Sequence, residues 1–200
     1  MSSSSTHDDR FLIIQAGFSG DLDRVMLGLT HSHEDVRASA LRSLHRMSAL
    51  PPDTLKSCLT DSSATVRRTA VELSPPFVDI DICPLINDSD VFVCEMTAWA
   101  LGERQSPTDN EIETLIHATL THSEMVVREA SAASLGSLGD PRGLPAILAA
   151  CSDKPAVRRR AILALAPFEG DAVESALRIA LEDNDWQVRQ NAEILLHPRE

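Results

Sequence analysis

The chain has 200 residues, of which 43% are hydrophobic and only 4% are aromatic, a composition typical of helices packed through leucine, valine, isoleucine and alanine. No apolar run approaches the roughly 18 residues of a membrane span, and Met1–His7 lacks the basic and apolar segments of a signal peptide. The four cysteines lie far apart without a CxxC pair, which excludes a disulfide framework or a zinc ribbon. We therefore expect a cytoplasmic protein with reduced thiols.

The net charge of -12 is concentrated in the middle of the chain. Residues 76–125 contain 10 acidic residues and 1 basic residue, a net charge of -9 (-10 + 1). Charge of this sign repels nucleic acid and anionic lipid surfaces, and it attracts basic proteins. We expect no nucleic acid and no membrane as a partner. The expected partner is a protein that is basic or presents a basic, partly apolar segment.

In chain order, residues 1–9 are predicted to be a disordered tail, and an apolar helix, Arg10–Gly17, is predicted to cap the segments that follow. Helical segments then alternate with breakers such as Pro51-Pro52 and Gly170-Asp171. Six helices are predicted, each followed by a short turn and a second helix: Asp21–Leu29, Asp53–Leu59, Asp79–Ile86, Asn110–Leu120, Leu144–Ala150 and Ala172–Leu181. Pro84 interrupts the third of them, and the longest linker, Gly102–Asn110, follows that unit.

The second helices share a valine, usually followed by arginine, that recurs about every 30 residues, a period that indicates a solenoid. The valines are Val36, Val66, Val93, Val127, Val157 and Val188. Four positions earlier stands a residue that favours a helix N-cap: Ser32, Ser62, Ser89, Ser123, Asp153 and Asn184. Eight positions later stands leucine in every repeat except the second. Offsets 0, 4 and 8 share one side of a helix, so they predict a buried stripe.

This pattern, carried by segments such as "VREASAASLGSLGDPRGLPAILAA" and "DNDWQVRQNAEILL", resembles the short HEAT repeats named after phycobilin lyases. The resemblance covers roughly residues 20–197 and implies an all-α fold, an α-solenoid with a HEAT-like superhelix of about six two-helix repeats. We expect it to form a single domain over residues 10–200. The resemblance also implies that the arginines after the valine contact acids in a neighbouring turn and are structural: Arg37, Arg67, Arg128, Arg158 and Arg189.

Three further functions come with the resemblance. HEAT-type hydroxylases hold two metals with four His-Glu pairs, whereas this chain has one such pair, His33-Glu34, placed before the repeat motif and not after it. HEAT proteins that excise bases present basic and aromatic residues to DNA, but Arg67-Arg68 and Arg158-Arg159-Arg160 flank an acidic middle. A lyase would need a larger chain. We expect no catalytic residue, metal or cofactor, with a nucleic-acid-binding or repair-related protein and a metal-dependent hydroxylase or lyase as alternatives.

Second helices of HEAT repeats line the concave side, and there the positions two and six after the valine point away from the buried stripe, at about 200° and 240°. The candidate binding residues at these positions are Glu95, Trp99 and Glu129 in the centre, flanked by Arg42, Arg68 and Arg159. Trp99 is either an exposed anchor or a filler of the irregular third repeat, and Trp186 is expected to seal the C-terminal end of the core. The leading hypothesis is a non-catalytic protein–protein interaction adaptor that uses this concave face.

Overall fold

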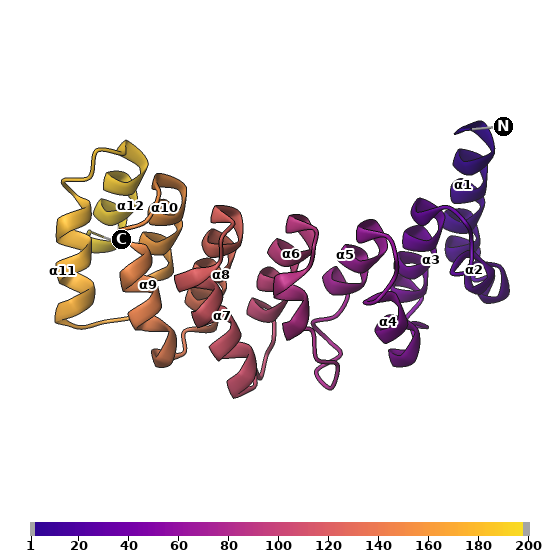
Figure 1. Cartoon of the computed structure of the whole chain (residues 1–200), viewed down its shortest axis with the longest axis horizontal. Helices are drawn as coiled ribbons and strands as arrows, with labels where there is room; N and C mark the ends of the chain where they lie inside the picture. The colour runs from indigo at the N-terminus through magenta and orange to yellow at the C-terminus, as the bar shows by residue number, and fades with distance from the viewer. Residues whose placement is uncertain (1–2, 198–200) are drawn as a thin grey trace. The chain divides into compact units, whose positions relative to one another are not determined.

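The regular structure is helical throughout residues 3–197, the part of the chain that the computed structural model describes. After α1 (Ser3–Ser19), the helices follow one another in pairs (Figure 1). The pairs are α2 (Leu22–Gly28) with α3 (Glu34–Arg46), α4 (Pro52–Cys58) with α5 (Ala64–Glu72), the 3-10 helix η1 (Cys83–Asn87) with α6 (Val91–Gly102), α7 (Asp109–Thr121) with α8 (Met125–Leu138), α9 (Leu144–Ala150) with α10 (Pro155–Ala164), and α11 (Asp171–Ala180) with α12 (Trp186–Leu196). A short 3-10 turn, η2 (Pro141–Gly143), precedes α9. The protein is an α-solenoid, as predicted.

The chain divides into two compact units, Met1–Ile82 and Cys83–Glu200. In the N-terminal unit, α1 packs on α2 and α3, and α3 packs on α5. In the C-terminal unit, the second helices α6, α8, α10 and α12 pack each against the next, and α7, α9 and α11 pack against them. Whether residues 10–200 act as one domain stays a prediction.

The predicted stripe on the second helices is the core of both units. All six repeat valines are buried, with exposed fractions of 0–1%. The leucines eight positions later are buried as well in α3, α6, α8 and α10. Small residues four positions after the valine, such as Ala40 and Ala161, are fully buried and let neighbouring helices approach closely.

The first helices begin and end within one residue of their predicted bounds, with one exception. The third was predicted at Asp79–Ile86, whereas the structure has only the 3-10 helix η1 at Cys83–Asn87. Proline lacks the N–H that a helix interior needs, so Pro84 is accommodated in the first turn of a short helix that starts beside it. The third repeat therefore has a shortened first helix.

Helix α1 begins at Ser3, seven residues before the predicted start, so it includes residues 3–9 of the predicted tail; residues 1–2 lie outside the described residues. Two tertiary contacts fix its N-terminal half. Arg10 Nε donates to Ser39 Oγ on α3 (3.2 Å), and Asp9 Oδ2 lies 3.5 Å from His31 Nε2. These contacts attach residues 9 and 10 of α1 to the following pair of helices.

Each second helix is capped one residue later than predicted, at His33, Ser63, Asp90, Glu124, Lys154 and Asp185. The reason lies in the turn before the cap. In five turns, the side chain two residues earlier accepts the N–H of the capping residue; these acceptors are His31, Asp61, Asp88, His122 and Asp183. The predicted position therefore lies in the middle of the turn, where it supplies a backbone carbonyl.

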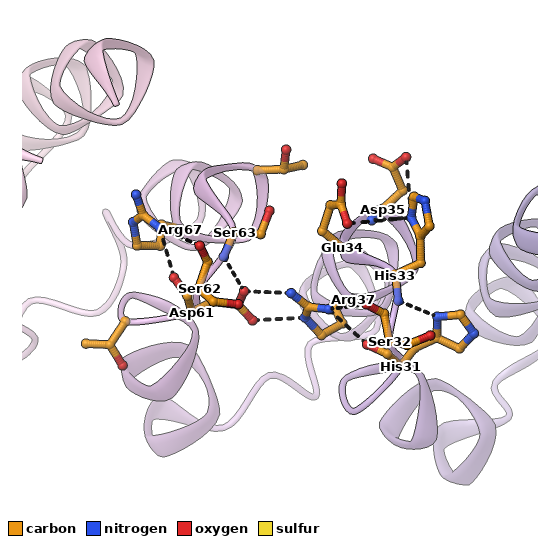
Figure 2. A network of polar contacts seen from close by, with 12 residues as sticks. His31, Ser32, His33, Glu34, Asp35, Arg37, Asp61, Ser62, Ser63 and Arg67 are labelled. Carbon is orange, nitrogen blue, oxygen red and sulfur yellow. Dashed lines mark hydrogen bonds and ion pairs between the residues drawn. The ribbon is translucent and has the colours of Figure 1, made fainter. Parts of the chain in front are cut away.

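Arginines link one turn to the next (Figure 2). Arg37 binds both carboxylate oxygens of Asp61, at 2.9 and 2.7 Å, and its Nη1 also donates to the carbonyls of His31 and Ser32 in its own turn. Arg128 does the same with Asp153, and Arg158 with Asp183. The structural role implied for these three arginines is confirmed.

Hydrogen bonding lowers the pKa of the three aspartates bound by these arginines, Asp61, Asp153 and Asp183. Bonds from Arg128 and Arg158 hold the pKa of Asp153 and Asp183 below the usual 3.8, against the opposing effect of burial. Burial is the largest single influence on Asp61 and raises its pKa, but Arg37 and the N–H of Ser63 outweigh it together, and the net shift is downward. These carboxylates thus stay charged in the folded protein to lower pH than in the unfolded chain.

Histidine replaces aspartate where the preceding repeat presents no arginine. Cys94 occupies the arginine position of α6, and its Sγ donates to the carbonyl of Asp88 (3.1 Å). In the next turn, His122 Nδ1 accepts the N–H of Glu124, which assigns the ring proton to Nε2, and that nitrogen donates to the carbonyl of Ile86 (3.1 Å). His122 thus keeps the acceptor that the aspartates supply within the turn, but toward the preceding repeat it offers an N–H donor in place of a carboxylate acceptor.

The linker predicted to be the longest, between α6 and α7, is shorter than residues 73–82 between α5 and η1, because the third first helix is reduced to η1. An ion pair that the sequence did not indicate joins this linker to α7. Arg104 and Glu111 are only 3% and 5% exposed, and Arg104 Nε lies 3.3 Å from Glu111 Oε1. Glu111 also completes a capping box with Thr108 at the start of α7. The pair therefore fixes the linker to the first turn of α7.

The Cys94–His122 junction can be tested with a double-mutant cycle. Cys94→Arg and His122→Asp should each destabilise the fold, because each introduces a charge without its partner. Combined, the two new side chains are placed to form a pair like Arg128–Asp153, so we expect a favourable coupling energy of about 0.5–3 kcal/mol in urea unfolding at pH 7. Strictly additive effects would contradict this account of the turns.

Acid should destabilise the fold by protonating the aspartates that bind Arg37, Arg128 and Arg158. A carboxylate whose folded pKa is lowered stabilises the protein above its unfolded pKa of about 3.9, and this stabilisation is lost as the pH falls through the folded value. Asp153→Asn should cost about 1–3 kcal/mol at pH 7, between the effects found for exposed and for buried pairs. The difference between variant and wild type should shrink below about pH 4 in denaturant titrations. A pH-independent difference would refute the assignment.

Candidate interaction face

The second helices of the C-terminal unit share an outward side. It is formed by the residues one before and two, three and six after each repeat valine, which lie within about 100° on a helix. We call this side of α6, α8, α10 and α12 the second-helix face. Its outermost row is Trp99, Ala133, Leu163 and Ile194, and the tryptophan, leucine and isoleucine are 42%, 40% and 54% exposed. A row of apolar side chains thus crosses four packed helices.

Helix α6 carries the most apolar part of this face. Phe92, Met96 and Trp99 follow one another at helical spacing, and Phe92 is 56% exposed. The one charged residue of α6 is Glu95, which forms no ion pair within the described residues. A helix that is apolar on every side is normally covered by another surface. The outward side of α6 is therefore exposed apolar surface and a candidate for partner binding.

Polar side chains gather farther along the face, between α8, α10 and α12. A pocket of about 280 Å³ lies there, lined by Glu129, Ala156, Arg159, Arg160, Leu163, Gln187 and Asn191. Arg159 binds Asp185, with Nε 2.9 Å from Oδ1, and this bond lowers the pKa of Asp185 to about 2. Arg160 Nε lies 3.6 Å from Glu129 Oε1. The pocket thus mixes both charges over an apolar floor.

The structure groups four of the six candidate binding residues in one unit. Glu95 and Trp99 lie on α6, Glu129 lies on the adjacent α8, and Arg159 lines the pocket beside Glu129. Arg42 and Arg68 belong to the N-terminal unit. Arg42 is already paired with Glu72 on α5, at 2.6 Å, and Arg68 makes no ion pair in the part of the chain that the structure describes. Whether these six residues bind a partner stays a prediction.

Sequence reasoning missed Phe92, Arg160 and Asn191, because only offsets +2 and +6 were considered. Offsets -1 and +3 lie at about 260° and 300°, on the same side of the helix, and would have found them. Trp99 is 42% exposed, and whether it anchors a partner stays a prediction. Trp186 does not seal the core: it is 61% exposed at the first position of α12.

The described residues contain no group of three or more histidine, cysteine, aspartate or glutamate side chains that could hold a metal ion. The four cysteines are free thiols. Burial raises the pKa of Cys58 and Cys94, and raises that of Cys151 to about 11, so these sulfurs stay protonated and unreactive at neutral pH. Among the described helices, none is both long and apolar enough to cross a membrane.

A family model described as HEAT repeats matches residues 81–166 and 112–196, which together span more than half of the chain. The chain belongs to the HEAT-repeat family. A second model, described as a HEAT repeat associated with sister chromatid cohesion, matches residues 53–73. A search of curated proteins found no match.

Solved structures with the same fold include designed proteins. A designed armadillo repeat protein in complex with the peptide (KR)4 has a TM-score of 0.59 and 17% identity, covering 88% of this chain and 98% of that chain. An engineered protein has a TM-score of 0.61 and 19% identity, over 88% and 97% of the two chains. Human deoxyhypusine hydroxylase in complex with glycerol gives 0.49 and 18%, over 98% and 79%. At these identities, the first two comparisons show the fold alone.

The exposure of Trp99 predicts that its truncation destabilises the fold less than truncation of a buried residue of α6. Trp99→Ala should lower the free energy of unfolding by about 1 kcal/mol or less, because the side chain is 42% exposed. Leu101→Ala, two residues along the same helix and fully buried, should cost about 2–5 kcal/mol. Chemical unfolding of both variants tests the comparison, and equal losses would place Trp99 in the core.

Proposed function

We propose that the protein is a non-catalytic interaction module whose second-helix face binds a basic, partly apolar segment of a protein partner. One observation carries the proposal. An exposed aromatic stripe, Phe92 and Trp99, lies beside the unpaired carboxylate of Glu95. Exposed aromatic side chains are frequent binding hot spots, and a carboxylate next to them selects a cation.

Charge supports this choice of partner. The stripe lies within residues 76–125, which hold -9 of the net charge of -12. Two of the three arginines in the basic cluster of α10, Arg158 and Arg159, are paired with Asp183 and Asp185. Little basic surface is then left on this unit for nucleic acid, whereas a basic segment meets a complementary surface.

The comparison with designed repeat proteins supports the binding mode. The armadillo repeat protein described above holds a peptide of alternating lysine and arginine, and its fold is the same. A stacked array of helices moves little on binding, so a bound segment loses its own freedom but does not reorder the protein. The four free thiols suit the reducing environment of the cytoplasm, where we place this activity.

Binding can be measured with a synthetic probe. We would titrate the protein with a labelled peptide of three Lys-Arg-Leu triplets, and with a charge-reversed Glu-Asp-Leu peptide as a control. The basic peptide should bind and the acidic one should not. Trp99→Ala should weaken binding by about 2 kcal/mol, roughly thirtyfold, and Glu95→Lys should slow association in a salt-dependent way.

The matched control is Ile179→Ala, which removes an apolar side chain that is 72% exposed on α11, the first helix of the last pair. It should bind the basic peptide like the wild type. The proposal is wrong if neither peptide binds, or if Trp99→Ala binds normally while Ile179→Ala does not.

A further inference from the structure

The pocket between α8, α10 and α12 supplies what the aromatic stripe lacks, a cationic group on the same face. Its lining includes Arg160, Gln187 and Asn191 around Ala156 and Leu163. A volume of about 280 Å³ is below the size of most small-molecule sites. It suits one side chain of a bound segment better than a separate ligand.

The two arginines of the pocket differ in how firmly they are held. Arg159 binds both oxygens of Asp185, and Asp185 in turn caps α12 by accepting the N–H groups of Gln187 and Val188. Arg159 is therefore part of the fold. Arg160 is 49% exposed, and its Nε lies 3.6 Å from Glu129 Oε1, which is longer than a hydrogen bond. Its guanidinium is available to a further acceptor.

The amides beside Arg160 point to the same chemistry. Asn191 Nδ2 donates to the carbonyl of Arg159 at 3.1 Å, which fixes this amide at the pocket wall. The side chain of Gln187 makes no hydrogen bond within the described residues and can donate into the pocket. A guanidinium and an amide donor above an apolar floor match a carboxylate carried on a short aliphatic stem.

We propose that this pocket binds an aspartate or glutamate side chain of the same segment that docks on Trp99, so that the recognised segment is basic at one end and acidic at the other. This inference rests on the proposed function. The face continues past the pocket to Ile194, which is 54% exposed, so the segment extends across α12 and its acid is an internal residue. Opposite charges at two points of one face also fix the direction of the bound chain.

The spacing of the two charges follows from helix packing. Helix α8 lies between α6 and α10 and packs against both. Packed helices are about 8–10 Å apart, so α10, which lines the pocket, is two helix spacings or on the order of 16–20 Å from α6, which carries Glu95. An extended chain advances about 3.3 Å per residue, which places the acid about five or six residues from the base.

Calorimetric titrations with capped synthetic peptides test the proposal. One peptide carries Lys-Arg, five alanine and leucine residues, and then Glu; a second has the reverse order; matched peptides carry Gln in place of Glu. In one of the two directions, the Glu peptide should bind about tenfold more tightly than its Gln counterpart. Arg160→Met should remove this preference and leave the affinity for the Gln peptide unchanged.

Two controls complete the design. Arg178→Met, on the first helix α11, should keep the tenfold preference, because Arg178 is 70% exposed and paired with Glu174 within its own helix. Trp99→Ala should weaken the Glu and Gln peptides equally, because both dock on the tryptophan.

Three outcomes would overturn the inference. If Glu and Gln peptides bind equally and in a Trp99-dependent way, the pocket takes no acid, but the proposed function stands. A further peptide ends at the acidic position with Gln and a free C-terminal carboxylate. If this peptide binds about tenfold more tightly than the capped Gln peptide, and the Glu peptides do not, the pocket binds a chain terminus. If no peptide binds, the proposed function fails together with the inference.

Discussion

The ion pair between an arginine of one turn and an aspartate of the next is the contact on which the repeat depends. Arg37, Arg128 and Arg158 each hold two carboxylate oxygens of the following turn and at least one carbonyl of their own. These bonds offset part of the cost of burying the charge. Since a repeat contacts only its neighbours, this bond sets how the second helices line up and hence what their outward sides present.

The junction between α6 and α8 is held without that bond, and it borders the aromatic stripe. Ser134 Oγ donates to the carbonyl of Ala98 at 2.8 Å, and a Cβ on Gly102 would lie 2.5 Å from the same hydroxyl. Only glycine permits this approach. His122 adds a neutral donor where the other turns place an aspartate. Close packing therefore replaces charge at this junction, and Glu95 on the outer side of α6 keeps no internal partner.

Much of the fold could be predicted from the sequence, because valine, leucine and arginine recur at fixed offsets that reflect contacts within one repeat or to the next. The turn was misplaced by one residue, because its geometry depends on an acceptor such as Asp61 or His122 and not on the serine between acceptor and cap. The serine-rich start of α1 has no apolar pattern that marks it as a helix, and the bond from Arg10 to Ser39 is a tertiary contact that no local pattern encodes. At the candidate site, helical angles placed Trp99 outward, but only packing could reveal that 42% of its surface stays exposed.

The ion pairs of the arginines explain why a cluster of basic residues in this sequence is a poor indicator of nucleic-acid binding. Arg158-Arg159-Arg160 looks like a nucleic-acid contact, yet two of its three guanidiniums are bound to Asp183 and Asp185 of the next repeat. Each such pair removes one positive and one negative charge from the surface, so the excess of 30 acids over 18 bases is left to the exposed faces. Glu95 belongs to this excess, and Arg160 is a cation that its own repeat does not hold firmly. Glu95, Glu129 and Arg160 are thus the loosely held charges of the second-helix face, and they include both signs. A partner that satisfies Glu95 and Arg160 must carry the complementary order.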